Sequence, residues 1–112
     1  MKKGYKCIFA IVNNGFSEEA MQAARACGAR GGTILHARGT MSKEAEKTFN
    51  ITIQPDKEMV MILAKTEMVD GILKGLYTAI GTSTKAQGIV FAIPVDESIG
   101  LDNSTPTPEK EQ

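Results

Sequence analysis

The fold is decided by the stretch Gly28–Thr40, which reads GARGGTILHARGT. Gly28 stands where a left-handed C-cap would end a preceding helix, because glycine adopts positive φ angles at little steric cost. An apolar, β-branched run follows the glycine pair, and Gly39 ends it. The stretch therefore predicts the end of a helix, a glycine turn and a strand over about 33–38.

Residues 40–57 follow this strand and mix small, charged and β-prone side chains without a helical or strand period. The charged run Lys43–Lys47 is interpreted as a solvated loop or a fragment of helix, and the alternation from Phe49 to Ile53 allows a short strand arm. Such a segment cannot bury enough apolar surface to offset an ordering cost of roughly 1–2 kcal/mol per residue. We therefore expect a projecting loop that is mobile in the free protein and orders on meeting a ligand or partner.

Two halves of similar length make up the chain, each with signals for a strand, a helix and a strand. The expected elements are a strand at 5–12, a helix capped by Ser17 and ended by Gly28, the strand at 33–38, a strand at 58–64, a helix capped by Thr66 and ended by Gly81, and a strand at 89–95. The order βαββαβ predicts an α+β fold of the ferredoxin-like type, a sandwich in which a four-stranded antiparallel sheet carries two helices on one face.

Both faces of the expected sheet are apolar. In the first strand, for example, Cys7, Phe9 and Ile11 alternate with Ile8, Ala10 and Val12. Two helices cover only one face, and the other would be a large exposed apolar patch, so we expect self-association around a symmetry axis. A lysine at Ala10 or Ala92, according to which face the helices take, is expected to dissociate or unfold the assembly.

The chain has 112 residues, of which 42% are hydrophobic, and this suffices for one domain with one core, expected over residues 1–101. Residues 102–112 are rich in Pro, Ser, Thr and charged side chains and are expected to form a disordered tail. Thirteen basic and thirteen acidic residues cancel, and only 5% of residues are aromatic, so nothing favours nucleic-acid binding. No apolar run spans a bilayer and no leader sequence is recognisable, which predicts a cytoplasmic protein.

The sequence contains no recognisable catalytic or metal-binding motif. Cys7 and Cys27 are interpreted as buried small hydrophobic residues, because neither zinc-type nor CxxC spacing is present. His36, the only histidine, should point to the same side of its strand as Arg38 and has no triad partner. Carboxylates beside the long loop, such as Glu58, would lie where acid–base geometry is hard to hold. We therefore expect no catalytic residue, no bound metal and no enzymatic activity.

The loop before the last strand, Gly81–Gly88 (GTSTKAQG), is the best candidate for a binding site. Glycine-flanked backbone N–H groups, hydroxyls and a lysine are what an anion such as phosphate needs. An ordinary polar turn between a helix and a strand accounts for the same residues equally well. The candidate contacts are Gly81, Thr82, Ser83, Thr84, Lys85 and Gly88, together with Arg38, Gly39 and Thr40 at the exit of the second strand.

Four motifs, in this order, resemble the P-II nitrogen-regulatory signal protein family over about residues 5–101. They are Lys-X-X-X-Ala-Ile-Val in the first strand, Ala-X-X-X-Gly-Ala-X-Gly-Gly-Thr before the second, Arg38-Gly39-Thr40 at its exit, and Gly88–Val95 (GIVFAIPV). The resemblance implies a homotrimer of ferredoxin-like subunits, effector binding in clefts between subunits, and a long loop that docks on a transporter, enzyme or regulator. It places Arg38, Gly39 and Thr40 at the base of that loop, and Gly81–Gly88 in the loop that grips nucleotide phosphates.

The chain departs from the pattern of this family at three places. Lys85-Ala86-Gln87-Gly88 stands where typical members have Gly-Asp-Gly-Lys, and Asp96–Leu101 carries no arginine pair. The long loop is short and has no tyrosine, since Tyr5 and Tyr77 lie in a strand and a helix. Control by uridylylation at the usual tyrosine is therefore not available to this chain.

We accordingly expect a cytoplasmic trimeric signal protein that binds a small anionic effector at subunit clefts, with ATP, ADP and AMP as candidates and no obligatory cofactor. Through residues 40–57 it would regulate a partner protein, such as a membrane transporter or a metabolic enzyme, in nitrogen metabolism. Two alternatives stay open. One is a small ferredoxin-like lyase or isomerase that uses His36 and Arg38 on an acidic metabolite, and the other is a metal-tolerance-type trimer of related fold.

Overall fold

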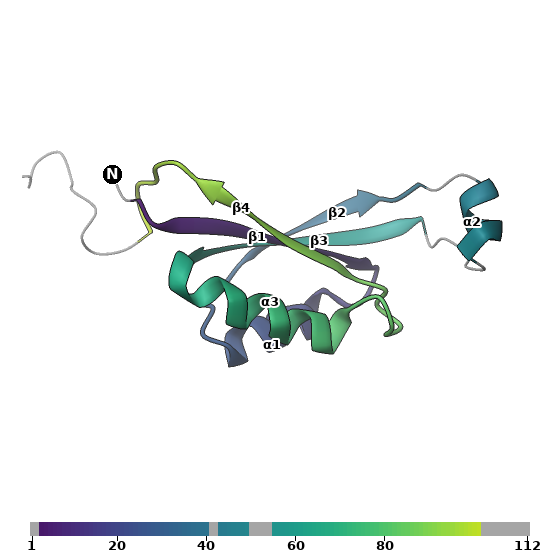
Figure 1. Cartoon of the computed structure of the whole chain (residues 1–112), viewed down its shortest axis with the longest axis horizontal. Helices are drawn as coiled ribbons and strands as arrows, with labels where there is room; N and C mark the ends of the chain where they lie inside the picture. The colour runs from purple at the N-terminus through teal and green to yellow at the C-terminus, as the bar shows by residue number, and fades with distance from the viewer. Residues whose placement is uncertain (1–2, 41–42, 50–54, 102–112) are drawn as a thin grey trace, which may run out of the picture.

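A computed structural model describes residues 3–40, 43–49 and 55–101 of the chain. Within these residues the elements follow one another as β1 (Tyr5–Asn13), α1 (Ser17–Ala26), β2 (Thr33–Arg38), α2 (Lys43–Phe49), β3 (Asp56–Lys65), α3 (Thr66–Ile80) and β4 (Ile89–Val95) (Figure 1). Apart from α2, this is the predicted order βαββαβ. In the described part of the chain, no helix has the length and apolar character needed to cross a membrane.

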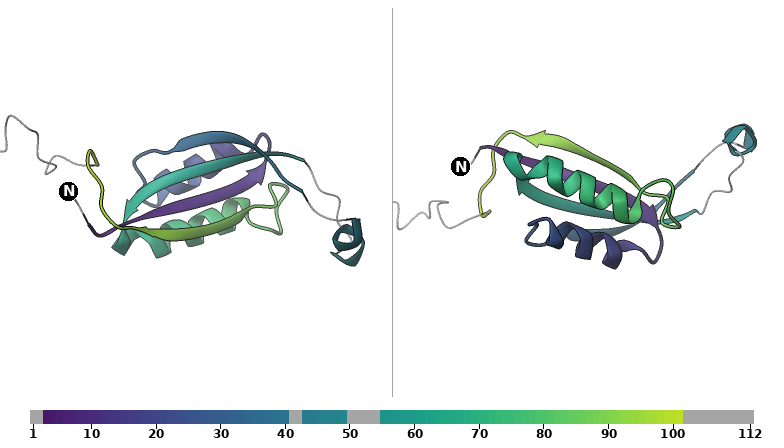
Figure 2. Two further views of the ribbon diagram at one scale, coloured as in Figure 1. Left: turned by 90° about the horizontal axis from the view of Figure 1, so that it is seen from above. Right: turned by 60° about the horizontal axis from the view of Figure 1, so that its bottom comes forward.

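The four strands form one antiparallel sheet in the order β2-β3-β1-β4. The helices α1 and α3 pack against each other and cover the same face of this sheet (Figures 1 and 2). The arrangement confirms the predicted ferredoxin-like α+β fold.

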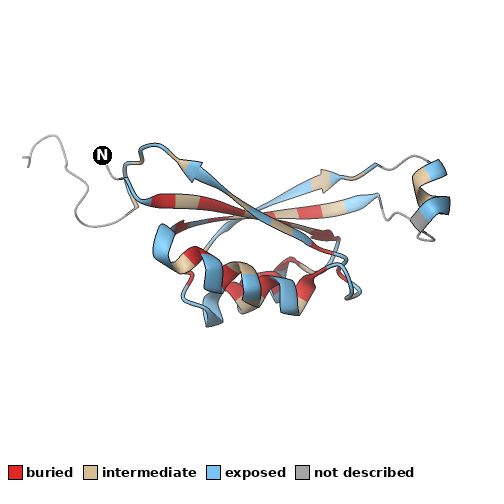
Figure 3. Ribbon diagram, in the orientation of Figure 1, coloured by how far each residue is buried: buried red, intermediate tan, exposed pale blue. Residues whose placement is uncertain are grey.

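The hydrophobic core lies between the sheet and these two helices. Alternate residues of β1 point into it, and Ile8, Ala10 and Val12 are all 0% exposed. The register pairs Ile8 with Ile62 and Ala10 with Val60, which extends the same buried layer into β3. The helices complete the core with Ala20, Met21, Ala24, Val69, Ile72, Leu76 and Ile80 (Figure 3). Each large side chain buried in this way contributes about 1.5–3 kcal/mol to folding.

The opposite face of the sheet, called the open face below, is also apolar and lies uncovered within the described chain. By the strand registers it consists of Phe9, Ile11, Leu35, Met59, Met61, Leu63, Ile89, Phe91 and Ile93. Phe9 and Phe91 stack with ring centroids 5.2 Å apart. Leu63, Ile89 and Ile93 remain 45%, 57% and 45% exposed. The prediction of a second apolar face is thus confirmed.

The two alanines proposed as probes of association belong to the helix side. Ala10 is 0% exposed and Ala92 packs against the same core. A lysine at either position would therefore disrupt the core of the subunit. A test of association needs a residue on the open face, such as Phe91, which is 41% exposed.

The start of α1 differs from the prediction, whereas its end agrees. Ser17 is the first residue of the helix, and the N-cap is Phe16, which makes no side-chain capping bond. At the other end Gly28 has a φ of 105°, and the amides of Gly28 and Ala29 each donate a 3.0 Å hydrogen bond back to the last turn. This is the Schellman arrangement, in which glycine takes the left-handed position.

Two further details of the prediction need correction. Lys65 is the N-cap of α3, and the Thr66 hydroxyl donates instead to the Gly4 carbonyl oxygen at 2.9 Å. Cys27 is exposed, because α1 ends one residue before it, whereas Cys7 is buried as predicted.

The long loop contains the helix α2, so the charged run Lys43–Lys47 is helical, which is one of the two predicted alternatives. Phe49 ends this helix, which contradicts a strand arm beginning at that residue. β3 begins at Asp56, two residues earlier than predicted. The helix α2 stands away from the sheet and from the two covering helices (Figures 1 and 2). The remainder of the proposed arm and the tail 102–112 lie outside the described residues.

Candidate functional site

The two segments predicted to form the site lie at the same end of the sheet. β1 and β2 end there, and β3 and β4 begin there (Figure 1). Lys57 of β3 pairs with Ala37 of β2 on one side and with Asn13 of β1 on the other. The backbone amide of Asn13 then donates to the Ala86 carbonyl oxygen at 2.9 Å. Only β3 and β1 therefore separate the base of the long loop from loop 81–88.

Lys57 and Asn13 also join these segments through their side chains. The stem of Lys57 lies against Gly39, where an added Cβ would be 2.9 Å from Lys57 Cε. Its ammonium group donates to Asn13 Oδ1 at 2.6 Å. Asn13 is only 7% exposed, and its Nδ2 donates to the Lys85 carbonyl oxygen at 3.0 Å and to Gln87 Oε1 at 3.4 Å. Burial lowers the pKa of the Lys57 ammonium below its ordinary value.

Two of the predicted hydroxyls in loop 81–88 already have protein partners. The Thr84 hydroxyl donates to the Gly81 carbonyl oxygen at 2.8 Å and accepts from the Ala86 amide at 3.2 Å. The Thr82 hydroxyl shares a 2.9 Å hydrogen bond with the Tyr77 hydroxyl. These contacts shape the loop, so a ligand would have to compete for both groups.

Thr82, Ser83, Lys85 and Gln87 are the exposed polar residues of the loop, and Thr82 and Gln87 have hydrogen-bond partners in Tyr77 and Asn13. Among the described residues, the Lys85 ammonium has no ion-pair partner. Gly88 closes the loop, because its amide donates to the Ile80 carbonyl oxygen at 2.7 Å and a Cβ at this position would collide with that oxygen. The loop thus presents one free cation on a backbone that is held at both ends.

The remaining predicted residues form the base of the long loop. Arg38 is exposed and pairs in register with Asp56 at the start of β3. The amide of Gly39 donates to the Pro55 carbonyl oxygen at 2.8 Å, which closes the base of the loop. Thr40 follows as an exposed residue. The structure therefore gives Arg38 access to the same end of the sheet as Lys85, without showing a direct contact between them.

The carboxylate of Glu58 has a defined structural role. It is 8% exposed, and its Oε1 accepts hydrogen bonds from the backbone amides of Gly15 at 2.9 Å and Ser17 at 3.2 Å. Burial raises the pKa of Glu58, but these hydrogen bonds, the Ser17 hydroxyl and the charge of His36 outweigh burial and leave the pKa lowered. The expectation that a fixed geometry is hard to hold at Glu58 is wrong, because the amides of Gly15 and Ser17 hold its carboxylate in place.

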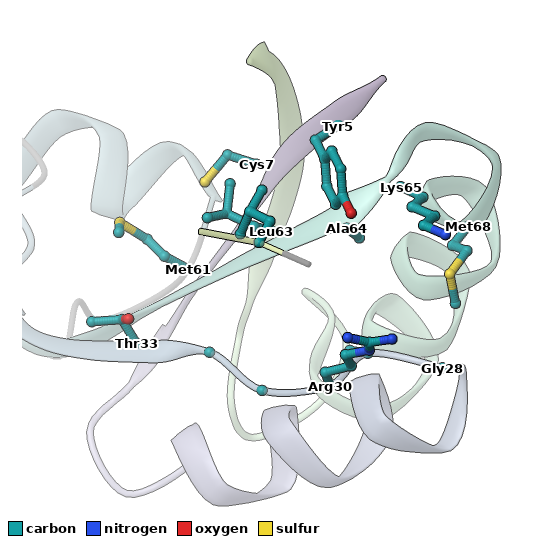
Figure 4. A pocket seen from close by; sticks show the side chains of 14 residues that line it. Tyr5, Cys7, Gly28, Arg30, Thr33, Met61, Leu63, Ala64, Lys65 and Met68 are labelled. Atoms are coloured by element: carbon teal, nitrogen blue, oxygen red, sulfur yellow. The ribbon is translucent and has the colours of Figure 1, made fainter. Parts of the chain in front are cut away.

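A groove of about 590 Å³ opens at the other end of the sheet (Figure 4). β1 and β3 contribute Tyr5, Leu63 and Lys65, and the α1–β2 connection contributes Arg30 and the adjacent glycines. The groove exists because β2 pairs with β3 only as far as Met61, whereas β1 follows β3 to Lys65. None of the predicted site residues lines it. Neither here nor elsewhere in the described residues do three His, Cys, Asp or Glu side chains gather as a metal site would require.

Comparison with known proteins identifies the family. The family model described as nitrogen regulatory protein P-II matches residues 5–103. This chain belongs to the P-II family. Among solved structures, Arabidopsis thaliana PII bound to citrate matches with a TM-score of 0.66 and 20% sequence identity, over 89% of this chain and 82% of that chain. No curated protein sequence matches the chain.

Membership confirms the resemblance seen in the sequence and identifies the chain as a P-II-like regulatory protein. The match to the Arabidopsis structure at 20% identity shows a shared fold. In this P-II chain the long loop carries the helix α2, and its base adjoins loop 81–88 through Lys57 and Asn13. The roles of Arg38, Lys85 and their neighbours in effector binding stay predictions.

Proposed function

We propose that this P-II chain works as a homotrimer that binds a small anionic effector between subunits and thereby regulates a partner protein through residues 40–57. ATP, ADP and AMP are candidate effectors, and a membrane transporter or a metabolic enzyme of nitrogen metabolism is the candidate partner. The observation that carries the proposal is the link from Gly39 through Lys57 and Asn13 to loop 81–88. It gives a bound anion a direct path to the base of the long loop.

The open face supports the homotrimer. Its exposed apolar side chains include Leu35, Leu63, Ile89, Phe91 and Ile93. Such a continuous apolar patch on a small domain marks an association surface. A cyclic assembly buries the same patch on every copy and leaves α1 and α3 on the outside.

Loop 81–88 supports an anionic effector. Lys85 is a free cation beside the exposed Ser83, and the backbone N–H groups of Thr82, Ser83 and Lys85 donate to no described residue. Such groups bind phosphate or carboxylate oxygens through charge-assisted hydrogen bonds. The Arabidopsis PII structure contains citrate, which is a small polyanion of this kind.

The helix α2 supports a docking role for residues 40–57. It stands away from the body of the subunit (Figure 1), and its exposed residues include Lys43, Glu44, Lys47 and Thr48. A charged helix held clear of its own domain is free to contact another protein. Its position at the effector end of the sheet would allow the ligand state to alter that contact.

Ligand screening tests the effector part of the proposal. The full-length protein is heated with ATP, ADP, AMP, cyclic dinucleotides, citrate, 2-oxoglutarate or bicarbonate, and its unfolding temperature is recorded. A ligand at 100 times its Kd stabilises the protein by about 2.7 kcal/mol, which is readily measured. Lys85→Ala should abolish the shift, whereas Lys74→Ala, which removes an exposed cation on α3, should preserve it. No shift with any of these compounds would contradict the effector site.

A further inference from the structure

The side chain of Tyr77 lies over the junction between α3 and loop 81–88. A Cβ added at Gly81 would be 2.7 Å from Tyr77 Cδ1 and 2.8 Å from Tyr77 Cε1, so the ring occupies the space that any larger residue would need. The Gly81 amide donates to the Tyr77 carbonyl oxygen at 2.9 Å, and the hydroxyls of Tyr77 and Thr82 share a hydrogen bond of 2.9 Å. Tyr77 thus contacts the first two residues of the loop.

The hydrogen bond between Tyr77 and Thr82 contributes little to the stability of the subunit. Tyr77 is 50% exposed and Thr82 is exposed, so water can replace either partner when the bond is broken. The hydroxyl of Thr78, the next residue of α3, donates to the Lys74 carbonyl oxygen of the same helix at 3.0 Å. The Tyr77 hydroxyl instead reaches out of the helix to a side chain of the loop. Its consequence is the orientation of Thr82 rather than the folding of α3.

The chemistry of the two hydroxyls sets the direction of this hydrogen bond. The phenolic oxygen of Tyr77 shares its lone-pair electrons with the ring, so it is a better donor and a poorer acceptor than the aliphatic hydroxyl of Thr82. The pair therefore favours Tyr77 as the donor, which leaves the Thr82 hydrogen free for another acceptor. An anion has to compete with Tyr77 only in the opposite direction. In the favoured direction it extends the chain from Tyr77 through Thr82, and each hydrogen bond in such a chain polarises the next.

The groups around the Thr82 hydroxyl suit an anionic oxygen. The backbone N–H groups of Thr82, Ser83 and Lys85 donate to no described residue, and the Lys85 ammonium makes no ion pair within the described chain. Thr84 already uses its hydroxyl to hold the loop, since it donates to the Gly81 carbonyl oxygen at 2.8 Å. Phosphate and carboxylate oxygens accept hydrogen bonds from amides, hydroxyls and ammonium groups arranged in this way.

We infer that Tyr77 is a positioning residue of the effector site, whose hydroxyl directs the Thr82 hydroxyl toward a phosphate or carboxylate oxygen of the ligand. The inference rests on the proposed function, because it assumes that an anion binds at loop 81–88. Tyr77 acts through Thr82 and does not itself contact the ligand. Removal of the Tyr77 hydroxyl should consequently weaken binding only while the Thr82 hydroxyl is present.

A double-mutant cycle tests this dependence. Calorimetry on the whole chain measures the affinity for ADP and for citrate of the wild type, of Tyr77→Phe, of Thr82→Val and of the variant that carries both substitutions. Each single substitution should weaken binding about three- to tenfold, as expected for one lost hydrogen bond. The double variant should bind no more weakly than Thr82→Val, because Tyr77 then has no hydroxyl to position. Equal weakening by Tyr77→Phe with and without the Thr82 hydroxyl would overturn the inference.

Two further variants exclude a general loss of loop structure. Thr82→Ser keeps the hydroxyl and should bind as the wild type does, whereas Thr82→Val keeps the shape of threonine and should bind more weakly. The reverse order would mean that the loop needs only the shape of this side chain, and the inference would fail. Thr78→Val is the matched control, because it removes an exposed hydroxyl from the next residue of α3 and should leave the affinity unchanged. Circular dichroism verifies that each variant is folded.

Lys85→Ala separates the inference from the proposed function, because it removes the cation of the loop without altering Tyr77 or Thr82. If Lys85→Ala weakens binding and Tyr77→Phe does not, the inference fails and the effector site at loop 81–88 stands. If neither substitution changes the affinity of a compound that binds the wild type, the proposed location of the effector is itself wrong. If the wild type binds neither ADP nor citrate, the proposed function fails for these effectors and the inference falls with it.

Discussion

Two buried polar side chains fix the backbone at the end of the sheet that carries loop 81–88 and the base of the long loop. The side chain and the backbone amide of Asn13 donate hydrogen bonds to loop 81–88, and its side-chain oxygen accepts one from Lys57. The carboxylate of Glu58 accepts hydrogen bonds from two backbone amides at the start of α1. Neither role was predictable from local sequence, because the partners of Asn13 lie 72 and 44 residues away. A polar residue at the end of an apolar strand is normally interpreted as a turn former. Only the strand register shows that it connects two loops.

Replacing Asn13 by alanine should loosen loop 81–88. The change leaves the Lys57 ammonium and the Lys85 carbonyl without their partner in a partly buried environment, which costs about 1–3 kcal/mol for each buried group left unsatisfied. Chemical denaturation should therefore show a lower free energy of unfolding, and hydrogen exchange should be faster over 81–88. Asn14→Ala is the matched control, since Asn14 is exposed. Equal exchange in both variants would remove Asn13 from its connecting role.

Glu58→Gln should change the dependence of stability on pH. The pKa of Glu58 is lowered in the folded protein, so its contribution is present above the ordinary value of 4.5 and is lost as the pH falls through the lowered native pKa. The neutral amide of glutamine still accepts hydrogen bonds, but more weakly, so the variant should be less stable at pH 7 by about 1–2 kcal/mol. The stability difference between wild type and variant should shrink toward acidic pH. Glu67→Gln, at an exposed carboxylate of α3, is the matched control for the loss of one negative charge.

The four strands and the two helices that cover the sheet were predictable, because their packing requires a periodic pattern of apolar residues in the sequence. The strands predicted at 33–38 and 89–95 agree with β2 and β4 residue for residue. A shift by one residue would turn the apolar side chains of a strand to the other face of the sheet, so the pairing register is strongly specified. The helix α2 was predicted only as one of two alternatives, because it stands away from the described sheet and helices, whose packing would otherwise require an apolar period. The groove was missed for a different reason. It arises where β2 stops short of the end of β3, and strand ends are the least certain feature of a sequence-based prediction.

The helix α2 should exchange its amide hydrogens rapidly in the free protein. A seven-residue helix without a buried face is far below the length of about 12–15 residues at which isolated helices become marginally stable. In hydrogen exchange, residues 43–49 should therefore resemble an unstructured peptide, whereas the buried face of α3 should be strongly protected. Addition of the effector or partner should slow exchange over the same residues. Slow exchange without any ligand would make α2 a rigid part of the fold and would remove the switching role of the loop.

For the whole molecule, the open face of the sheet is the feature that favours assembly. α1 and α3 cover one face, and the open face exposes an apolar layer that includes the stacked pair Phe9 and Phe91. The marginal stability of a small domain leaves little room for an uncovered face of this size in water. Assembly would therefore complete the core as much as it builds the effector cleft.

Phe91→Lys should dissociate the assembly. The substitution places a charge on the open face, where burial against a second copy would require desolvation of the ammonium group without a partner. Light scattering should show a trimer for the wild type and monomers or aggregates for the variant. The control Gln22→Lys adds the same charge on the exposed side of α1 and should stay trimeric. A stable wild-type monomer at micromolar concentration would contradict both the trimer and an effector site that lies between subunits.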